Sequence, residues 1–197
     1  MAVSVLLGHP DPGSFNHAVA SAAVRSLRRN GHGVRFHDLC MEGFDPALPA
    51  GEIPRGAVLP DAVALHCREI AEADGIVVVH PNWWGQPPAI LKGWVDRVLR
   101  PEVAYRFREG DAGDGVPVGL LQAKAAVVFT TSNTPREREQ AVFGDPLETL
   151  WKNCIFGLCG VRLFFRKNFA VVVTSTPAQR QAWLEEVREM LCIFTPA

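Results

Sequence analysis

Short β-rich runs alternate with longer amphipathic segments along this chain, and this alternation most constrains its fold. The β-rich runs occupy residues 3–8, 34–39, 75–79, 125–131 and 161–174. Apolar residues recur at helical spacing in residues 16–29, 61–73, 89–100, 146–156 and 177–192. Strands that are apolar on both faces and are joined by helices predict a parallel sheet with helices on both faces. We therefore expect an α/β fold with a doubly wound, five-stranded parallel sheet.

Three details of this pattern are less regular. The last β-rich run carries Arg166 and Lys167 in its middle, where the strand could be broken. Residues 43–60 are rich in proline and glycine and predict a long loop. In residues 89–100, Lys92, Asp96 and Arg100 follow one another at i,i+4 spacing, opposite the apolar stripe.

Composition narrows the class of protein. With 197 residues and 48% hydrophobic residues, the chain has the size and apolar content for a single domain over residues 1–197. The formal net charge of -1 disfavours nucleic acid as a partner, and no apolar run is long enough for membrane insertion. The N-terminus lacks the basic segment of a signal peptide, and the five cysteines form no C-x-x-C pair. We therefore expect a cytoplasmic protein with free, reduced thiols.

Three polar and aromatic loops follow predicted strands. They are residues 9–16 (HPDPGSFN), 80–88 (HPNWWGQPP) and 130–135 (TTSNTP). In open α/β sheets, ligands bind beyond the carboxyl ends of the strands, where the strand order reverses. We therefore expect these three loops to form one site.

The first loop leads directly into a predicted helix. Ser14 and Asn16 offer a hydroxyl and an amide beside the free N–H groups of the helix start, which together favour phosphate binding. The alternative is that either residue only caps the helix. Neither G-x-x-x-x-G-K-[ST] nor G-x-G-x-x-G occurs, so the loop is not a Walker or Rossmann phosphate motif.

The second loop places two adjacent tryptophans beside prolines and a glycine. Trp83 and Trp84 cannot easily both point into a core, so we expect at least one of them to line a site for a planar heteroaromatic ring. The third loop offers small hydroxyl and amide groups that suit the polar edge of such a ring.

Several motifs, taken in order, carry a family resemblance. SFN, PNWWGQPPAILKGWVDRVL, AY-x-F, TTSN, FGD and CG resemble the NAD(P)H:quinone oxidoreductases, the quinone reductase and modulator of drug activity type, over nearly the whole chain. The resemblance implies a flavodoxin-like fold and a bound flavin, FAD with FMN as the alternative. It also implies NAD(P)H as co-substrate, a quinone or similar electrophilic acceptor, and a homodimer with its active sites at the interface.

The resemblance also implies roles for individual residues. The first loop would hold the flavin phosphate and ribityl chain through His9, Ser14, Phe15 and Asn16. The second loop would meet the isoalloxazine ring through Pro81, Asn82, Trp83, Trp84 and Gly85. The third would meet the pyrimidine edge through Thr130, Thr131, Ser132 and Asn133. Tyr105, Phe107 and Phe143 would line the nicotinamide and quinone pocket, the first two from the partner subunit in many members.

The chain departs from the family in one segment. The best-known members carry a tyrosine and a histidine between the third loop and the G-D pair, whereas residues 134–143 contain neither, and Phe143 stands where the histidine would be. We therefore assign no catalytic residue.

Three alternatives remain at this point. His9-Pro10-Asp11 is similar to a motif of zinc-dependent deacetylases, but only His80 follows as a further candidate ligand near a site, so we expect no metal. A flavin- or nucleotide-binding ancillary subunit, of the potassium-efflux type, would share the same loops. A serine hydrolase is disfavoured because G-x-S-x-G is absent.

Overall fold

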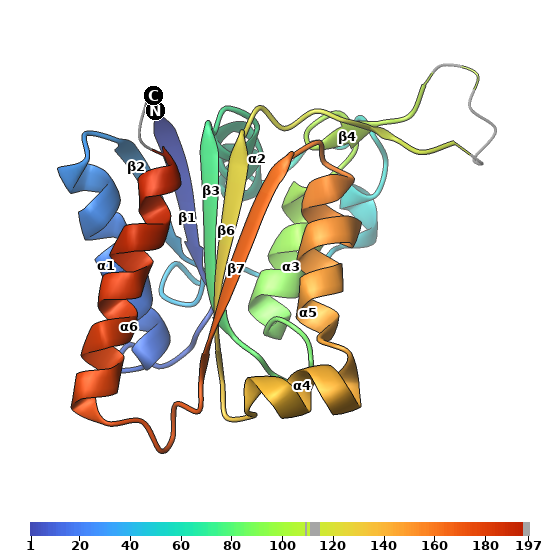
Figure 1. The fold of residues 1–197 in the computed structure, drawn as a ribbon. Coiled ribbons are helices and arrows are strands. Elements are labelled where there is room, and N and C mark those ends of the chain that lie inside the picture. Colours follow the sequence, from blue (N-terminus) through green and yellow to red (C-terminus); the bar gives the residue numbers. More distant parts are fainter. Residues whose placement is uncertain (109, 111–114, 195–197) are drawn as a thin grey trace.

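A parallel sheet of five strands forms the centre of the protein (Figure 1). The computed structural model describes residues 1–108, 110 and 115–194. The strand order is β2-β1-β3-β6-β7, which reverses direction between β1 and β3 and confirms the predicted flavodoxin-like sheet. The strands are β1 (Ala2–Leu7), β2 (Gly33–Asp38), β3 (Gly75–Pro81), β6 (Ala125–Ser132) and β7 (Leu163–Ala170).

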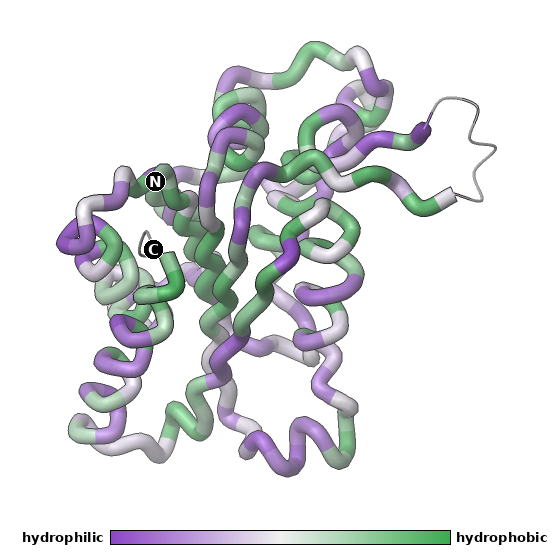
Figure 2. The backbone as a smooth tube through the Cα atoms, turned by 45° about the horizontal axis from the view of Figure 1, so that its top comes forward, coloured by the Kyte–Doolittle hydropathy of each residue, from purple (hydrophilic) through white to green (hydrophobic). Residues whose placement is uncertain are grey.

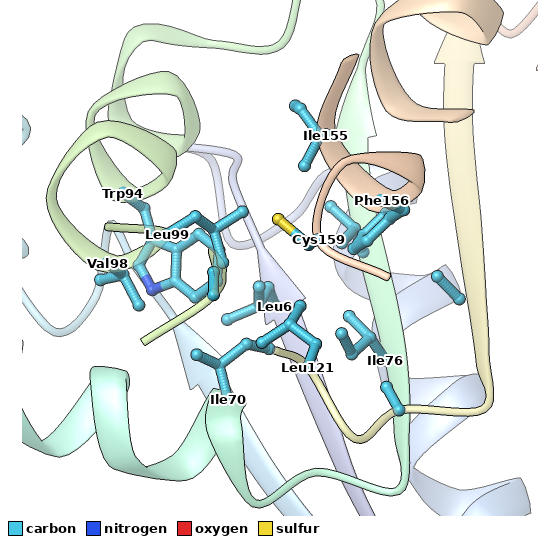
Figure 3. Close-up of a cluster of buried hydrophobic side chains, with 14 of the residues drawn as sticks. Leu6, Ile70, Ile76, Trp94, Val98, Leu99, Leu121, Ile155, Phe156 and Cys159 are labelled. Carbon is cyan, nitrogen blue, oxygen red and sulfur yellow. The ribbon is translucent and has the colours of Figure 1, made fainter. Parts of the chain in front are cut away.

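Helices cover both faces of the sheet because successive strand residues point to opposite sides. In β3, Val77 packs with helices α1 (Phe15–Arg29) and α6 (Pro177–Met190), whereas Ile76 packs on the other face. That other face is covered by α2 (Asp61–Ala71), α3 (Ala89–Val98), α5 (Pro146–Thr149) and the π-helix η2 (Leu150–Gly157). Figure 3 shows this second core, where Trp94 of α3 and Phe156 of η2 lie over Leu6 and Ile76.

Polar side chains cap the N-termini of α1 and α6. Ser14 caps α1 by accepting a hydrogen bond from the His17 backbone N–H. Thr176 caps α6 in a capping box with Gln179, and Pro177 occupies the first turn. Each cap satisfies N–H groups that the helix itself leaves free.

Helix α4 (Arg136–Phe143) is absent from the sequence prediction. It begins with charged and polar residues, and its apolar residues come together only at its end (Figure 2), so it has no apolar stripe from which helical periodicity could be recognised. It covers neither face of the sheet and lies instead at the end where the strands finish (Figure 1).

Other elements differ in their bounds. The helix predicted over residues 146–156 is a short α-helix that continues as η2. Strand β7 is shorter than residues 161–174, and it runs unbroken because Arg166 forms ion pairs with Asp145 and Glu148. A hairpin of β4 (Tyr105–Arg106) and β5 (Val118–Gly119) was not predicted. Two 3-10 turns, η1 (Ala50–Glu52) and η3 (Leu191–Phe194), complete the described elements.

The loop over residues 43–60 is held by arginines at the end of α3. The buried Arg97 guanidinium pairs with the equally buried Glu52 carboxylate, 2.9 Å from Nε to Oε2. Arg100 was expected on the polar face with Lys92 and Asp96, which is wrong: α3 ends at Val98, and Arg100 is buried, donating to the Glu52 carbonyl at 2.8 Å. Among the described residues, no helix is long and apolar enough to span a membrane.

Candidate functional site

A cavity of about 790 Å³ opens at the carboxyl ends of β1, β3 and β6, where the three loops meet. This is the end of the sheet that carries α4 in Figure 1. All the predicted cofactor-binding residues except Thr130 line the cavity, together with Phe143. Two further residues of the predicted loops, Asp11 and Thr134, also line it. Four residues that the sequence did not indicate complete the lining: Glu139, Pro146, Val172 and Val173.

The first loop is joined to the third by a buried hydrogen bond. Asn16, only 3% exposed, donates from Nδ2 to the Thr131 hydroxyl at 2.9 Å. Because a lost partner would leave a buried polar group unsatisfied, this bond fixes the two walls of the cavity relative to each other. Ser14 and the first N–H groups of α1 lie beside it and provide anion-binding capacity.

His9 is held in its neutral form at the edge of the cavity. Its Nδ1 accepts a hydrogen bond from the Asp11 backbone N–H at 3.1 Å, so the neutral ring carries its proton on Nε2. Burial is the main cause that lowers the pKa of His9, and the neighbouring His17 adds to the effect. The His9 ring also lies 5.8 Å from the ring of Trp83, centroid to centroid.

The second loop forms a tight turn that turns both tryptophans outward. Trp83 is 45% exposed and Trp84 is fully exposed, so neither is a core residue, and both line the cavity. That they form a site for a planar ring stays a prediction. Trp84 and Gly85 have φ angles of 58° and 72°, a conformation that is strained for tryptophan but not for glycine. The Asn82 side chain stabilises this turn by accepting from the Gly85 N–H at 3.0 Å.

Glu139 of α4 is the main site residue that sequence reasoning missed. It is 4% exposed, lines the cavity, and accepts a hydrogen bond from the Asn82 Nδ2 group at 3.0 Å. The Glu139 carboxylate therefore supports the turn that presents the tryptophans. Its only sequence signal would have been a helix assignment for residues 136–143, which the hydrophilic pattern did not provide.

In the third loop the two threonines point in different directions. Thr131 lines the cavity, whereas Thr130 is fully buried and donates to the Asn168 side chain at 3.0 Å. Ser132 and Asn133 both line the cavity, and the Asn133 side chain accepts from the Val173 N–H at 3.0 Å. Residues after β7 are thereby drawn into the site.

His80 lies directly before the second loop but does not face the cavity. Its Nδ1 is 2.8 Å from the Pro81 carbonyl, and its Nε2 accepts from the indole N–H of Trp151 at 2.9 Å. Complete burial lowers the pKa of His80 to about 4. With one nitrogen donating and the other accepting, His80 is a neutral structural residue and has no free lone pair for a metal.

Two of the predicted pocket residues lie far from this cavity. Tyr105 and Phe107 belong to or follow β4, and their rings contact each other at 5.8 Å. The hairpin lies at the amino ends of the strands, because the Leu121 N–H bonds to the Cys159 carbonyl just before β7 (Figure 1). Phe143, in contrast, is at the rim of the cavity and 52% exposed.

One group of residues outside the cavity has metal-ligand composition. His37, Glu42 and His66 bring their ligand atoms within 4.8 Å, the one such cluster in the described part of the chain. The His66 Nδ1 accepts from the Trp94 indole N–H at 3.1 Å, so its Nε2 carries the proton and cannot bind a metal. The cluster is therefore a hydrogen-bonded group in the wall of the second core.

The family of the chain follows from its similarity to known proteins. A family model described as "flavodoxin-like fold" matches residues 1–191. The chain belongs to this family. An uncharacterized NAD(P)H oxidoreductase of Haemophilus influenzae is 33% identical over 186 residues, covering 92% of this chain and 89% of the relative.

Two further relatives are similar in sequence or structure. The human ribosyldihydronicotinamide dehydrogenase [quinone] is 27% identical and covers 94% of this chain and 90% of the human protein. The structure of an NAD(P)H:quinone oxidoreductase from Methanothermobacter marburgensis is 26% identical with a TM-score of 0.80, covering 96% of this chain and 94% of the other. The resemblance to the quinone oxidoreductases noted in the sequence is confirmed.

Proposed function

We propose that this flavodoxin-like protein is a flavin-dependent oxidoreductase that passes electrons from NAD(P)H to a quinone or a similar electrophilic acceptor. The observation that carries the proposal is the meeting of all three predicted loops around one cavity of about 790 Å³. The similarity to NAD(P)H oxidoreductases over nine-tenths of the chain supports the same function.

The residues around the cavity fit a flavin. A phosphate needs N–H and O–H donors, which the first turn of α1 and Ser14 offer. A planar ring needs a flat apolar wall, which Trp83 and Trp84 offer, with Phe143 at the rim. The ring's polar edge needs small donors and acceptors, which Thr131 and Asn133 offer. FAD is favoured over FMN by the family resemblance alone.

The flavin would supply the redox chemistry, accepting a hydride and passing on electrons. The chain's own residues bind and orient the reactants. Glu139 and Asn82 hold the second loop in its turn, and Asn16 ties the first loop to the third. No histidine other than His9 lines the cavity among the described residues, and His9 is kept neutral, so these residues act by positioning.

We further propose a cytoplasmic homodimer, each chain a single domain, that shares its sites between chains. Tyr105 and Phe107 cannot reach the cavity of their own chain, because the eight residues of β6 separate the two ends of the sheet by about 26 Å. Phe107 is 37% exposed, and a second copy could place it over the cavity. None of the five cysteines, all among the described residues, forms a disulfide, which fits a reducing compartment.

A spectrum tests the central proposal. The purified protein is expected to absorb as a flavoprotein near 450 nm, or to do so after incubation with FAD or FMN, and to be bleached by NADH or NADPH under anaerobic conditions. Chromatography of the released cofactor distinguishes FAD from FMN. A colourless protein that takes up neither flavin would refute the function.

A further inference from the structure

A chain of three side chains runs from the cavity into the protein. Ser14 lines the cavity, and its hydroxyl oxygen lies 2.9 Å from Nδ1 of His17. The Nε2 of His17 lies 2.8 Å from the Asp38 carboxylate at the end of β2. His17 itself does not line the cavity, and its side chain is only 15% exposed. Any effect of His17 on a ligand in the cavity must therefore act through Ser14.

The protonation state of His17 decides what Ser14 can offer. Neutral His17 donates its Nε2–H to Asp38, so its Nδ1 is a hydrogen-bond acceptor. The Ser14 hydroxyl therefore donates its one hydrogen bond to Nδ1. Ser14 then turns only oxygen lone pairs toward the cavity, which repel an anionic oxygen. Protonated His17 donates from both nitrogens, so the Ser14 proton is free to point into the cavity. A phosphate at the first loop is therefore compatible with only one state of His17.

We propose that His17 is a positioning residue that takes up a proton when a phosphate group binds at the first loop, with Asp38 stabilising the resulting imidazolium. This inference rests on the proposed function, since the phosphate considered is that of the flavin. It adds that cofactor binding is linked to proton uptake at a residue outside the cavity.

The groups around His17 support its choice as the proton acceptor. Two titratable groups face it directly, His9 from the first loop and Asp38 from the end of β2. Asp11 interacts with His9, and Cys40 interacts with Asp38. The His9 ring is 6.2 Å from that of His17, but its Nδ1 already accepts from the Asp11 N–H. Protonating His9 would break this bond, whereas protonating His17 only reverses the direction of its hydrogen bond with Ser14.

Asp38 is fixed for this role by the backbone. Its Oδ1 accepts from the Met41 N–H at 3.2 Å, while Oδ2 faces His17. The Asp38 side chain is 12% exposed, so its charge is only partly screened by water. The contact between Asp38 and His17 therefore becomes an ion pair once His17 is protonated.

The test measures flavin affinity as a function of pH with two ligands that differ in their phosphate. FAD carries a diphosphate whose charge is constant between pH 5 and 9, and riboflavin carries none. We expect the affinity for FAD to fall by up to about tenfold per unit rise in pH, because binding takes up one proton. Calorimetry in buffers of different ionisation enthalpy should show up to one proton taken up with FAD and none with riboflavin. If the protein takes only FMN, riboflavin 5′-sulfate replaces FAD because its charge is also constant.

Three variants assign the proton to His17. His17→Asn places an amide where Nδ1 lies, so it can donate to Ser14 at every pH; it should bind FAD without proton uptake and with a flat pH profile. Asp38→Asn should reduce FAD affinity and proton uptake while leaving riboflavin binding unchanged. His9→Gln is the matched control, in which proton uptake should persist.

The outcomes separate this inference from the proposed function. If no flavin binds to the wild-type protein at any pH, the proposed function fails. If FAD binds with the same pH profile in wild type and His17→Asn, or if His9→Gln binds FAD without proton uptake, the role of His17 is refuted while the flavin function stands.

Discussion

His80 should lower the free energy of unfolding at acid pH, and substituting this residue should remove its contribution. The residue is fully buried beside the second loop, and its pKa is lowered from 6.5 to about 4 in the folded state. Between these two values the unfolded chain binds a proton that the folded chain does not. Unfolding is therefore favoured as the pH falls below 6.5, and stability is regained as the pH rises.

The size of the effect follows from the two pKa values. Full titration through this interval would remove about 3 kcal/mol from the free energy of unfolding, and the part between pH 7 and pH 5 is about 2 kcal/mol. His66, whose pKa burial also lowers to about 4, adds a similar loss, so wild type alone cannot identify the source.

His80→Gln isolates the contribution of this residue. Glutamine still offers an acceptor to the Trp151 indole N–H and does not titrate. Urea unfolding of the two apoproteins, followed by tryptophan fluorescence, should show that wild type loses about 2 kcal/mol more than the variant between pH 7 and pH 5. Equal losses would refute the argument. If the variant does not fold, the imidazole NMR resonance of His80 in wild type provides the same answer: titration near 6.5 would contradict it.

Four further outcomes concern the cavity. Asn16→Leu should weaken flavin binding by about 1–3 kcal/mol, because Thr131 loses its partner; a loss of thermal stability without a loss of affinity would restrict Asn16 to a structural role. Glu139→Gln should keep flavin bound but raise the midpoint potential of the flavin in a spectroelectrochemical titration, because a negative charge at the cavity is removed. An unchanged potential would mean that Glu139 acts only through its hydrogen bond with Asn82. Phe143→His should change acceptor turnover more than flavin affinity, and equal changes would make Phe143 a packing residue. Mixing Asn16→Leu with Phe107→Ala subunits should restore activity by leaving one intact site per heterodimer; no recovery would exclude shared sites.

The sequence predicted those parts of the structure that depend on local pattern. The central strands β3 and β6 are recognisable because both of their faces are buried, and the loops at their ends follow from the topology. The exposed tryptophans were predicted because two adjacent indoles do not fit one core.

The parts that were missed depend on tertiary contacts or on register. Helix α4 carries no apolar stripe, so neither the helix nor the buried Glu139 could be recognised. Thr130 lies one residue before the part of β6 that lines the cavity, and its hydroxyl is buried against the Asn168 side chain, a tertiary contact that the sequence does not reveal. Arg100 appeared to belong to a polar helix face, but the helix ends two residues earlier.

The buried pair of Arg97 and Glu52 holds the loop over residues 43–60 in place on the protein. This loop carries Phe44, whose ring packs on His66 and lies under the Arg97 guanidinium at 5.5 Å. Losing either member of the pair leaves the other charge buried alone, at a cost of about 3–5 kcal/mol. The detached loop would expose the apolar surface of α2 and α3 to chaperones, proteases and other unfolded chains. Substitutions here would therefore lower the cellular abundance of the protein while every molecule that remained folded kept its full catalytic capacity.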